Sequence, residues 1–220
     1  VSIAAETDLT IEAGVEVLFD VQEPFIVEGQ LYANGSPGSE VIFDVGGAGE
    51  WYGLRFGGGA YAELDFAVVT GVNTVNDGRP GYDEHGAIYA HDEFTEVNIT
   101  NSKIIGNHAD SYGGGIVVLF GATVYVANTL IDGNSAFSSG GAIDITDSEA
   151  TFDHCTIVGN NSYAAPMGIY GTANVMFDNC TIVWNHSDVD GAIRVYGQSN
   201  TTLRSSIVRV NSAPAQIEPD

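Results

Sequence analysis

Apolar and polar residues alternate in short runs along this chain, and one such run is written five times between residues 86 and 211. Each copy opens with two residues followed by an Ile, most often as Gly-Ala-Ile or Gly-Gly-Ile. The alternation continues beyond the Ile, as in Ile143-Asp144-Ile145, which places apolar side chains on one side of an extended segment. The openings carry Ile88, Ile116, Ile143, Ile169 and Ile193, which are 28, 27, 26 and 24 residues apart.

Each copy closes on an Asn that follows an Ile or Val by three residues and another apolar residue by eight. These closing residues are Asn107, Asn134, Asn160, Asn185 and Asn211. A repeat length that both the Ile positions and the Asn positions share predicts a solenoid whose repeats stack on one continuous core. Because an Asn amide at a turn can bond its own coil and the next, we expect this column to form a ladder. A second column is a candidate for another ladder: Asn101, Asn128, His154, Asn179 and Ser205.

Repeats of this length occur in leucine-rich repeats and in parallel β-helices, and composition separates the two. Leu is scarce, the apolar period is two, and Gly, Asn, Thr and Ser fill the gaps, which favours three short strands per coil joined by turns. Stacking such coils in register makes parallel sheets, and the crossover rule makes the winding right-handed. The sequence therefore predicts an all-β fold.

The Gly-Ala-Ile openings and the closures of the type Phe-x-Asn-x-Thr-Ile-x-x-Asn resemble a known repeat. It is that of the right-handed parallel β-helices of secreted and surface-attached microbial proteins, within the broad pectate-lyase-like superfamily. The resemblance implies an extracellular or cell-surface location. Its motifs specify a fold and not a chemistry.

We expect one β-helix domain over residues 1–220, with about seven or eight coils of 24–28 residues. Residues 1–50 are predicted to form one or two opening coils, and residues 86–211 the five regular repeats. Residues 51–85 form an atypical coil with a loop inserted at about Asn73 to His85. Residues 212–220 are a tail, so either the chain is part of a longer solenoid or its open end pairs with another chain.

The formal net charge is −23, from 29 acidic residues against six basic ones. Such a chain repels nucleic acid and anionic membranes, and it repels polyanionic sugars unless cations intervene. Two interpretations stay open: an acidic surface suited to a saline habitat, or a surface that binds Ca²⁺. A cluster in and beside the inserted loop supplies candidate metal ligands: Asp77, Asp83, Glu84 and Asp92.

Outward-facing residues of the Gly-Ala-Ile strands are the candidates for ligand binding. Tyr89, Asp144, Tyr170 and Arg194 are expected in one column, and His91 and Tyr196 in the next. Tyr rings with polar neighbours on a flat sheet suit stacking against sugar rings. Catalysis by a glycosidase requires two carboxylates on one cleft, and this column has one. We therefore assign no catalytic residue, with Asp144 and Arg194 as the nearest candidates.

Cys155 and Cys180 occupy the same position in adjacent copies, so their Cα atoms should lie about one strand spacing apart, ~4.8 Å. This spacing permits a disulfide. Both side chains point the same way in a column that otherwise holds Ser and Thr, which favours two buried, stacked thiols.

Three functions follow from these features. The first is a non-catalytic extracellular structural or adhesive module with glycans or Ca²⁺ as candidate ligands. The second is a polysaccharide-active lyase or glycoside hydrolase that uses the outer sheet face. The third is a unit that self-associates end to end through its open coils. No cofactor other than Ca²⁺ is expected.

Overall fold

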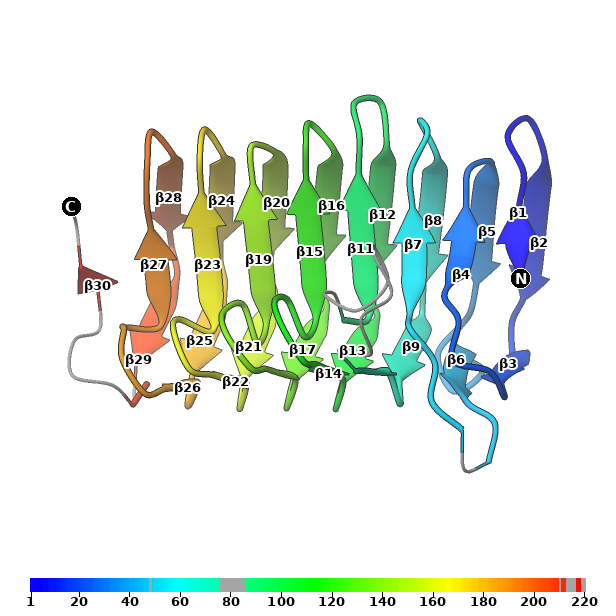
Figure 1. Ribbon diagram of the computed structural model, residues 1–220, viewed down its shortest axis with the longest axis horizontal. Helices are drawn as coiled ribbons and strands as arrows, with labels where there is room; N and C mark the ends of the chain where they lie inside the picture. Colours follow the sequence, from blue (N-terminus) through cyan, green and yellow to red (C-terminus); the bar gives the residue numbers. More distant parts are fainter. Residues whose placement is uncertain (48, 76–85, 210, 213–216, 219–220) are drawn as a thin grey trace.

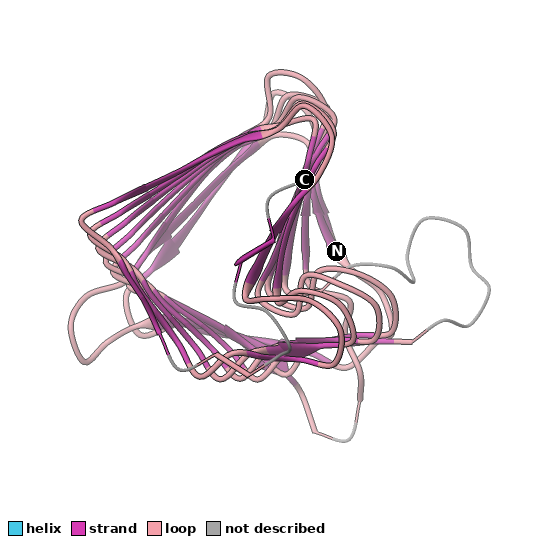
Figure 2. Cartoon of the chain, turned by 90° about the vertical axis from the view of Figure 1, so that its left-hand side faces the viewer, coloured by secondary structure: helices cyan, strands magenta, loops and turns pink. Residues whose placement is uncertain are grey.

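A computed structural model describes residues 1–47, 49–75, 86–209, 211–212 and 217–218. These residues form a single parallel β-solenoid of eight coils, in agreement with the predicted fold class (Figure 1). Seen along its axis, the strands of successive coils overlie one another and enclose a common interior (Figure 2). The inserted loop predicted at Asn73 to His85 lies largely outside the described residues, although Asn73 and Thr74 form strand β10.

Four sheets make up the solenoid, and each coil contributes one strand to most of them. Sheet A consists of β1 (Ser2–Ile3), β4 (Phe25–Val27), β7 (Leu54–Phe56), β11 (Ile88–His91), β15 (Ile116–Leu119), β19 (Ile143–Thr146), β23 (Met167–Tyr170), β27 (Ile193–Val195) and β30 (Ile217–Glu218). Sheet B consists of β2 (Asp8–Glu12), β5 (Gln30–Asn34), β8 (Tyr61–Asp65), β12 (Glu96–Thr100), β16 (Thr123–Ala127), β20 (Glu149–Asp153), β24 (Asn174–Asp178) and β28 (Asn200–Arg204).

Sheet C follows sheet B along each coil. It consists of β3 (Glu16–Phe19), β6 (Val41–Val45), β9 (Ala67–Thr70), β13 (Lys103–Ile105), β17 (Leu130–Asp132), β21 (Thr156–Val158), β25 (Thr181–Val183) and β29 (Ile207–Arg209). A narrow sheet D, which the sequence did not predict, adds a fourth strand to five coils: β10 (Asn73–Thr74), β14 (His108–Ala109), β18 (Ser135–Ala136), β22 (Asn161–Ser162) and β26 (His186–Ser187).

The interior is a continuous apolar core built from the inward positions of sheets A, B and C. Stacked aromatic pairs occur within it, with Phe152 and Phe177 at 5.0 Å between ring centroids and Phe19 and Trp51 at 4.2 Å. Since each coil is too thin to bury its own apolar residues, the coils are stable only when they stack.

The closing Asn residues form the predicted ladder. The Nδ2–H of Asn134 donates to Oδ1 of Asn160 at 3.0 Å, and the same group of Asn160 donates to Asn185 at 2.9 Å. Each Oδ1 also accepts the backbone N–H of the preceding Asn, as from Asn134 to Asn160 at 2.9 Å. These amides are buried, so the ladder satisfies polar groups that would otherwise destabilise the core.

The second column shares a backbone conformation rather than a chain of amides. Its residues have φ near +50°, in the left-handed region: Asn101, Asn128, His154, Asn179 and Ser205. Asn101 donates its amide to Oδ1 of Asp65 at 2.8 Å and not to the next member. Their role is to turn the chain between sheets B and C, which Asn tolerates better than most residues.

Cys155 and Cys180 are free thiols, as the sequence favoured. Each Sγ donates to the carbonyl two residues earlier, at 3.4 Å for Cys155 and 3.3 Å for Cys180. Ser102 and Ser206 use their hydroxyls in the same way in other coils. The hydrogen bond with Cys180, together with burial, raises the pKa of Cys155, so this thiol stays protonated at neutral pH.

The register of β23 corrects one expectation from the sequence. Ile143 pairs with Met167, and Ile145 pairs with Ile169, so the fourth opening is anchored by Met167 and not by Ile169. Consequently Gly168, not Tyr170, continues the outward column of Asp144. Tyr170 pairs with Thr146 in the next column. The sequence misled because Met167-Gly168-Ile169 imitates the small-small-Ile opening two residues out of register.

Candidate ligand-binding site

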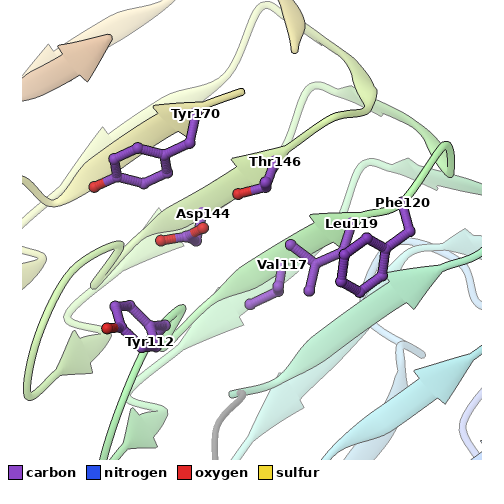
Figure 3. A pocket seen from close by; sticks show the side chains of 7 residues that line it. All are labelled: Tyr112, Val117, Leu119, Phe120, Asp144, Thr146 and Tyr170. Carbon is purple, nitrogen blue, oxygen red and sulfur yellow. The ribbon is translucent and has the colours of Figure 1, made fainter. Parts of the chain in front are cut away.

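A pocket of about 380 Å³ lies on the outer face of sheet A. It is lined by Tyr112, Val117, Leu119, Phe120, Asp144, Thr146 and Tyr170 (Figure 3). Three neighbouring strands supply its floor, with Val117 and Leu119 on β15, Asp144 and Thr146 on β19, and Tyr170 on β23. The volume is at the lower end of the ~300–1,000 Å³ that is usual for small-molecule sites.

Asp144 is the most unusual side chain of the pocket. It is only 5% exposed, and its Oδ2 atom has no hydrogen-bond partner among the described residues. Its sheet neighbours are Val117 on one side and Gly168 on the other, and neither offers a charge or a donor from its side chain. Burial raises the pKa of Asp144 to about 7. The carboxyl is therefore about half protonated at neutral pH and largely protonated in mildly acidic solution, and its acid form can both donate and accept a hydrogen bond.

Tyr170 forms one wall of the pocket because Gly168 leaves room for its ring. A Cβ atom at Gly168 would lie 2.5 Å from Cε2 of Tyr170 and 2.9 Å from Oγ of Ser139. The ring crosses the Gly168 backbone, and its hydroxyl is 2.8 Å from Oγ of Ser139. Burial raises the pKa of Tyr170, so its hydroxyl is neutral.

The two edges of the pocket come from turns. Tyr112, 44% exposed, lies in the loop between β14 and β15. Phe120, 59% exposed, lies in the turn between β15 and β16, where its φ of 56° directs the chain away from sheet A. Both rings are exposed and can contact a ligand in the pocket.

The pocket brings together two of the six predicted ligand-binding residues, Asp144 and Tyr170. Tyr89 and His91 lie on β11, with their ring centroids 4.9 Å apart. The guanidinium of Arg55 lies 5.3 Å from the centroid of the Tyr89 ring. These residues form a separate group on the far side of the β15 side chains.

Arg194 and Tyr196 form a third group at the other end of the face. Nη1 of Arg194 donates to Oδ2 of Asp190 at 2.8 Å, and Cζ lies 6.0 Å from the Tyr196 ring centroid. Arg194 is two strands from Asp144 in the register, with Gly168 between them. The pocket itself holds one carboxyl, which falls short of the pair that glycoside hydrolysis requires.

Of the four candidate metal ligands, Asp92 is described, and Asp77, Asp83 and Glu84 lie outside the described residues. Oδ2 of Asp92 is 2.9 Å from Nδ1 of His91 and accepts the N–H of Gly58 at 3.2 Å. The hydrogen bond with His91 lowers the pKa of Asp92. No group of three or more His, Cys, Asp or Glu side chains suited to a metal ion occurs in the described part of the chain.

A family model described as "Right handed beta helix region" matches residues 86–216, which is more than half of the 220 residues. The chain belongs to the right-handed β-helix family. No curated protein and no solved structure matches it. No helix in the described ranges combines the length and the apolar character that crossing a membrane requires.

The described residues of this β-helix also contain two hydrogen-bonded Ser-His-Asp chains that we did not predict from the sequence. Nδ1 of His108 is 2.8 Å from Oγ of Ser135, and its Nε2 is 3.1 Å from Oδ1 of Asp110. The second chain joins Ser212, His186 and Asp188 with distances of 2.6 and 3.2 Å. However, the backbone N–H of Ser135 already donates to Asn107, so it is not free to stabilise an oxyanion. We assign these chains no catalytic role.

Tyr112 and Phe120 are pocket residues that we did not predict from the sequence. The repeat pattern identifies inward and outward positions on strands, whereas turn residues fall between the anchors. A usable signal was an aromatic residue directly before Gly, as in Tyr112-Gly113 and Phe120-Gly121. In a β-helix such a residue sits where the chain leaves or enters a sheet, at the edge of a face.

Proposed function

We propose that this β-helix is a non-catalytic extracellular or cell-surface module that binds a glycan on the outer face of sheet A. The pocket at Asp144 is the sugar site. One observation carries the proposal: a buried carboxyl with an unpartnered Oδ2 lies among exposed aromatic side chains. The exposed rings of Tyr112 and Phe120 can stack on a sugar, and the Asp144 carboxyl gives the pocket floor a polar character.

The chemistry of the pocket suits a sugar better than an ion. Sugars combine apolar C–H faces, which stack on Tyr and Phe rings, with hydroxyls that donate and accept. Asp144 in its acid form, Thr146 and the hydroxyl of Tyr170 can both donate and accept as well. The remaining walls are apolar and would leave a charged group poorly solvated.

Glycan binding is tested with the full chain on a glycan array, followed by calorimetry with the best ligands. We expect Asp144→Ala and Tyr170→Ala to weaken binding at least about tenfold. The matched control is Tyr125→Ala, which removes a Tyr from the outer face of sheet B and should leave binding unchanged. Equal losses in all three variants, or binding that survives both pocket variants, would overturn this site.

A second candidate function is that of a polysaccharide-active enzyme, because the pKa of about 7 at Asp144 is suited to a general acid. Incubation of the bound glycan with the protein, followed by product analysis, distinguishes the two. Turnover by the wild type that disappears in Asp144→Asn would favour the enzyme. Binding without turnover over a long incubation supports the module.

A further inference from the structure

The two end coils of the solenoid leave strand edges unpaired in the described part of the chain. In sheet B, β28 lies at one end of the strand order and β2 at the other, and in sheet C the end strands are β29 and β3 (Figure 1). Each of these strands has a neighbouring strand on one side only. The other edge is a template for pairing with a further chain.

The apolar core is also open at both ends. Leu203 is 40% exposed, although Phe177, at the same inward position one coil earlier, is fully buried. At the other end Leu9 is 37% exposed, whereas its sheet neighbour Leu31 is fully buried. A hollow of about 490 Å³ lies beside Leu9 and is lined mostly by apolar side chains of the first coil. Each end therefore presents apolar surface that a further coil would bury.

The two ends carry opposite charges. Residues 1–24 hold no Lys or Arg, and their acidic residues are Glu6, Asp8, Glu12, Glu16, Asp20 and Glu23. Residues 193–209 hold no Asp or Glu, and their basic residues are Arg194, Arg204 and Arg209, out of six in the whole chain. Like ends of two copies therefore repel each other, and unlike ends attract.

We propose that the molecule stacks head to tail, with the last coil of one copy (β27, β28 and β29) against the first coil of a second copy (β1, β2 and β3). Sheet B fixes which residues meet at such a junction, because its strands keep the same columns from β2 to β28. Leu203 meets Ile11 inside the core. Arg204 meets Glu12 on the outer face, so an apolar pair and an oppositely charged pair coincide in one register.

Sheet C gives a junction of the same kind. Its columns bring Val208 of one copy over Val17 of the next, both of them inward-facing residues that are half-buried in the single molecule. Parallel pairing then continues through the junction as it does between successive coils (Figure 2). Because the interface joins two different surfaces, it is heterologous, and its repetition builds a filament along the solenoid axis.

Strand β30 occupies part of this end among the described residues. It pairs with β27, where Ile193 lies opposite Ile217 and Arg194 opposite Glu218, and it pairs with neither β28 nor β29. In the stacked arrangement, β1 of the second copy takes the place of β30 beside β27. Both strands are two residues long, so one short pairing replaces another while β28 and β29 gain neighbours on their outer edges.

Sedimentation velocity of the full chain over a range of concentrations tests this proposal. We expect the wild type to form species larger than a dimer as its concentration rises, because each added copy presents a new open end. Leu9→Lys and Leu203→Lys each place a charge where the junction buries it, and each should weaken association at least about tenfold. The matched control is Tyr125→Lys, whose site is 39% exposed on the outer face of sheet B, and it should associate as the wild type does.

All three sites are similarly exposed in the single molecule, so the Lys side chain reaches water and the fold is retained. Circular dichroism of each variant checks this. An equimolar mixture of Leu9→Lys and Leu203→Lys then distinguishes the interface from a symmetric one. Each variant keeps one intact end, so the mixture should form a heterodimer and nothing larger.

Three results would overturn the proposal: a mixture that stays monomeric, an end variant that still dimerises by itself, or a wild type that stays monomeric up to about 1 mM. The glycan pocket lies on the side of the solenoid and uses neither end. These results therefore leave the proposed function unaffected.

Cross-linking tests the register of the junction. Thr10 and Thr202 occupy one outward column of sheet B, so stacking places their Cα atoms about one strand spacing apart, ~4.8 Å. A mixture of Thr10→Cys and Thr202→Cys should form an intermolecular disulfide with glutathione disulfide as the oxidant. The control pair is Thr10→Cys with Thr151→Cys, whose second site lies in a middle coil, and it should not cross-link above background. Equal yields from the two pairs would contradict the proposed register.

Discussion

Sheets A and B belong to the same coils and alternate in the same way, yet their outer faces have opposite characters. The outward positions of sheet B carry eight carboxylates and one Arg: Asp8, Glu12, Glu63, Asp65, Glu96, Glu149, Asp153, Asp178 and Arg204. Those of sheet A from β4 to β27 carry one carboxyl, Asp144, and two Arg, Arg55 and Arg194.

The difference follows from what borders each face. Sheet A is flanked by the loop of Tyr112 on one edge and the turn of Phe120 on the other, and these remove its centre from water. Burial raises the pKa of the Asp144 carboxyl on that floor, whereas the carboxylates on sheet B are exposed or half-buried. The two outer faces therefore differ in solvation, because sheet B presents many carboxylates to solvent and sheet A carries one buried carboxyl.

The largest expected effect is a pH dependence that originates at Asp144. Its pKa is about 7 in the folded protein and ~3.9 in an unfolded chain. Between these values the folded state holds a proton that the unfolded state has lost, so stability falls as pH rises. Relative to Asp144→Asn, the free energy of unfolding of the wild type should fall by about 4 kcal/mol from pH 4 to pH 8. Urea unfolding at the two pH values measures this, and parallel curves for both proteins would refute it.

A second experiment introduces a carboxylate on the outer face of sheet A, where sheet B carries many. Val117→Glu buries a carboxylate beside Asp144 and should destabilise the protein by about 3 kcal/mol. The same charge at Thr151→Glu, on the open face of sheet B, should cost about 0.5 kcal/mol or less. Urea midpoints of the two variants provide the comparison. Similar costs would mean that the two faces are equally solvated.

A third experiment alters the wall of the pocket. Gly168→Ala places a Cβ atom 2.5 Å from the Tyr170 ring, so the ring must move and lose its bond to Ser139. We expect a loss of about 1–2 kcal/mol in stability and weaker glycan binding. Tyr170→Phe removes the hydroxyl but keeps the ring, so comparing its glycan affinity with that of Gly168→Ala separates the contribution of the hydroxyl from that of the ring position. Glycan affinity retained in Gly168→Ala would contradict the role of the ring.

The smallest expected effect concerns an ion pair on sheet B. Arg204 donates from Nε to Oδ2 of Asp178 at 3.0 Å, and this pair lowers the pKa of Asp178. The Arg204 side chain is exposed and Asp178 keeps partial contact with solvent, so Arg204→Ala should change neither the melting temperature nor glycan binding beyond experimental error. A loss that disappears in high salt would show that electrostatics on sheet B contribute more than we expect.

Much of the fold could be predicted from the sequence because stacking imposes periodic requirements. Asn134 and Asn160 occupy the same position in successive coils because each bonds the next Asn, so the ladder could be predicted from the sequence. The register of Met167 could not be predicted from the sequence, because Gly168-Ile169 satisfies the same pattern two residues away. Sheet D was missed because two-residue strands such as His108–Ala109 leave no alternation to detect.

The candidate site was predicted only in part, for a physical reason. Asp144 could be placed on the outer face of its sheet from alternation alone, but its burial depends on loops that the repeat does not constrain. Tyr112 and Phe120 lie in such loops. The pairing of Tyr170 with Ser139 depends on Gly168 beside it, and that relation appears only when the coils are stacked.

The most direct test of this account is an NMR titration of the Asp144 side-chain carboxyl carbon in the folded wild-type protein. We expect a midpoint of about 7, because burial on the sheet A face withholds solvent from the carboxyl. A midpoint near ~3.9, the ordinary value for an Asp, would show a solvated carboxyl and would contradict the distinction between the two faces.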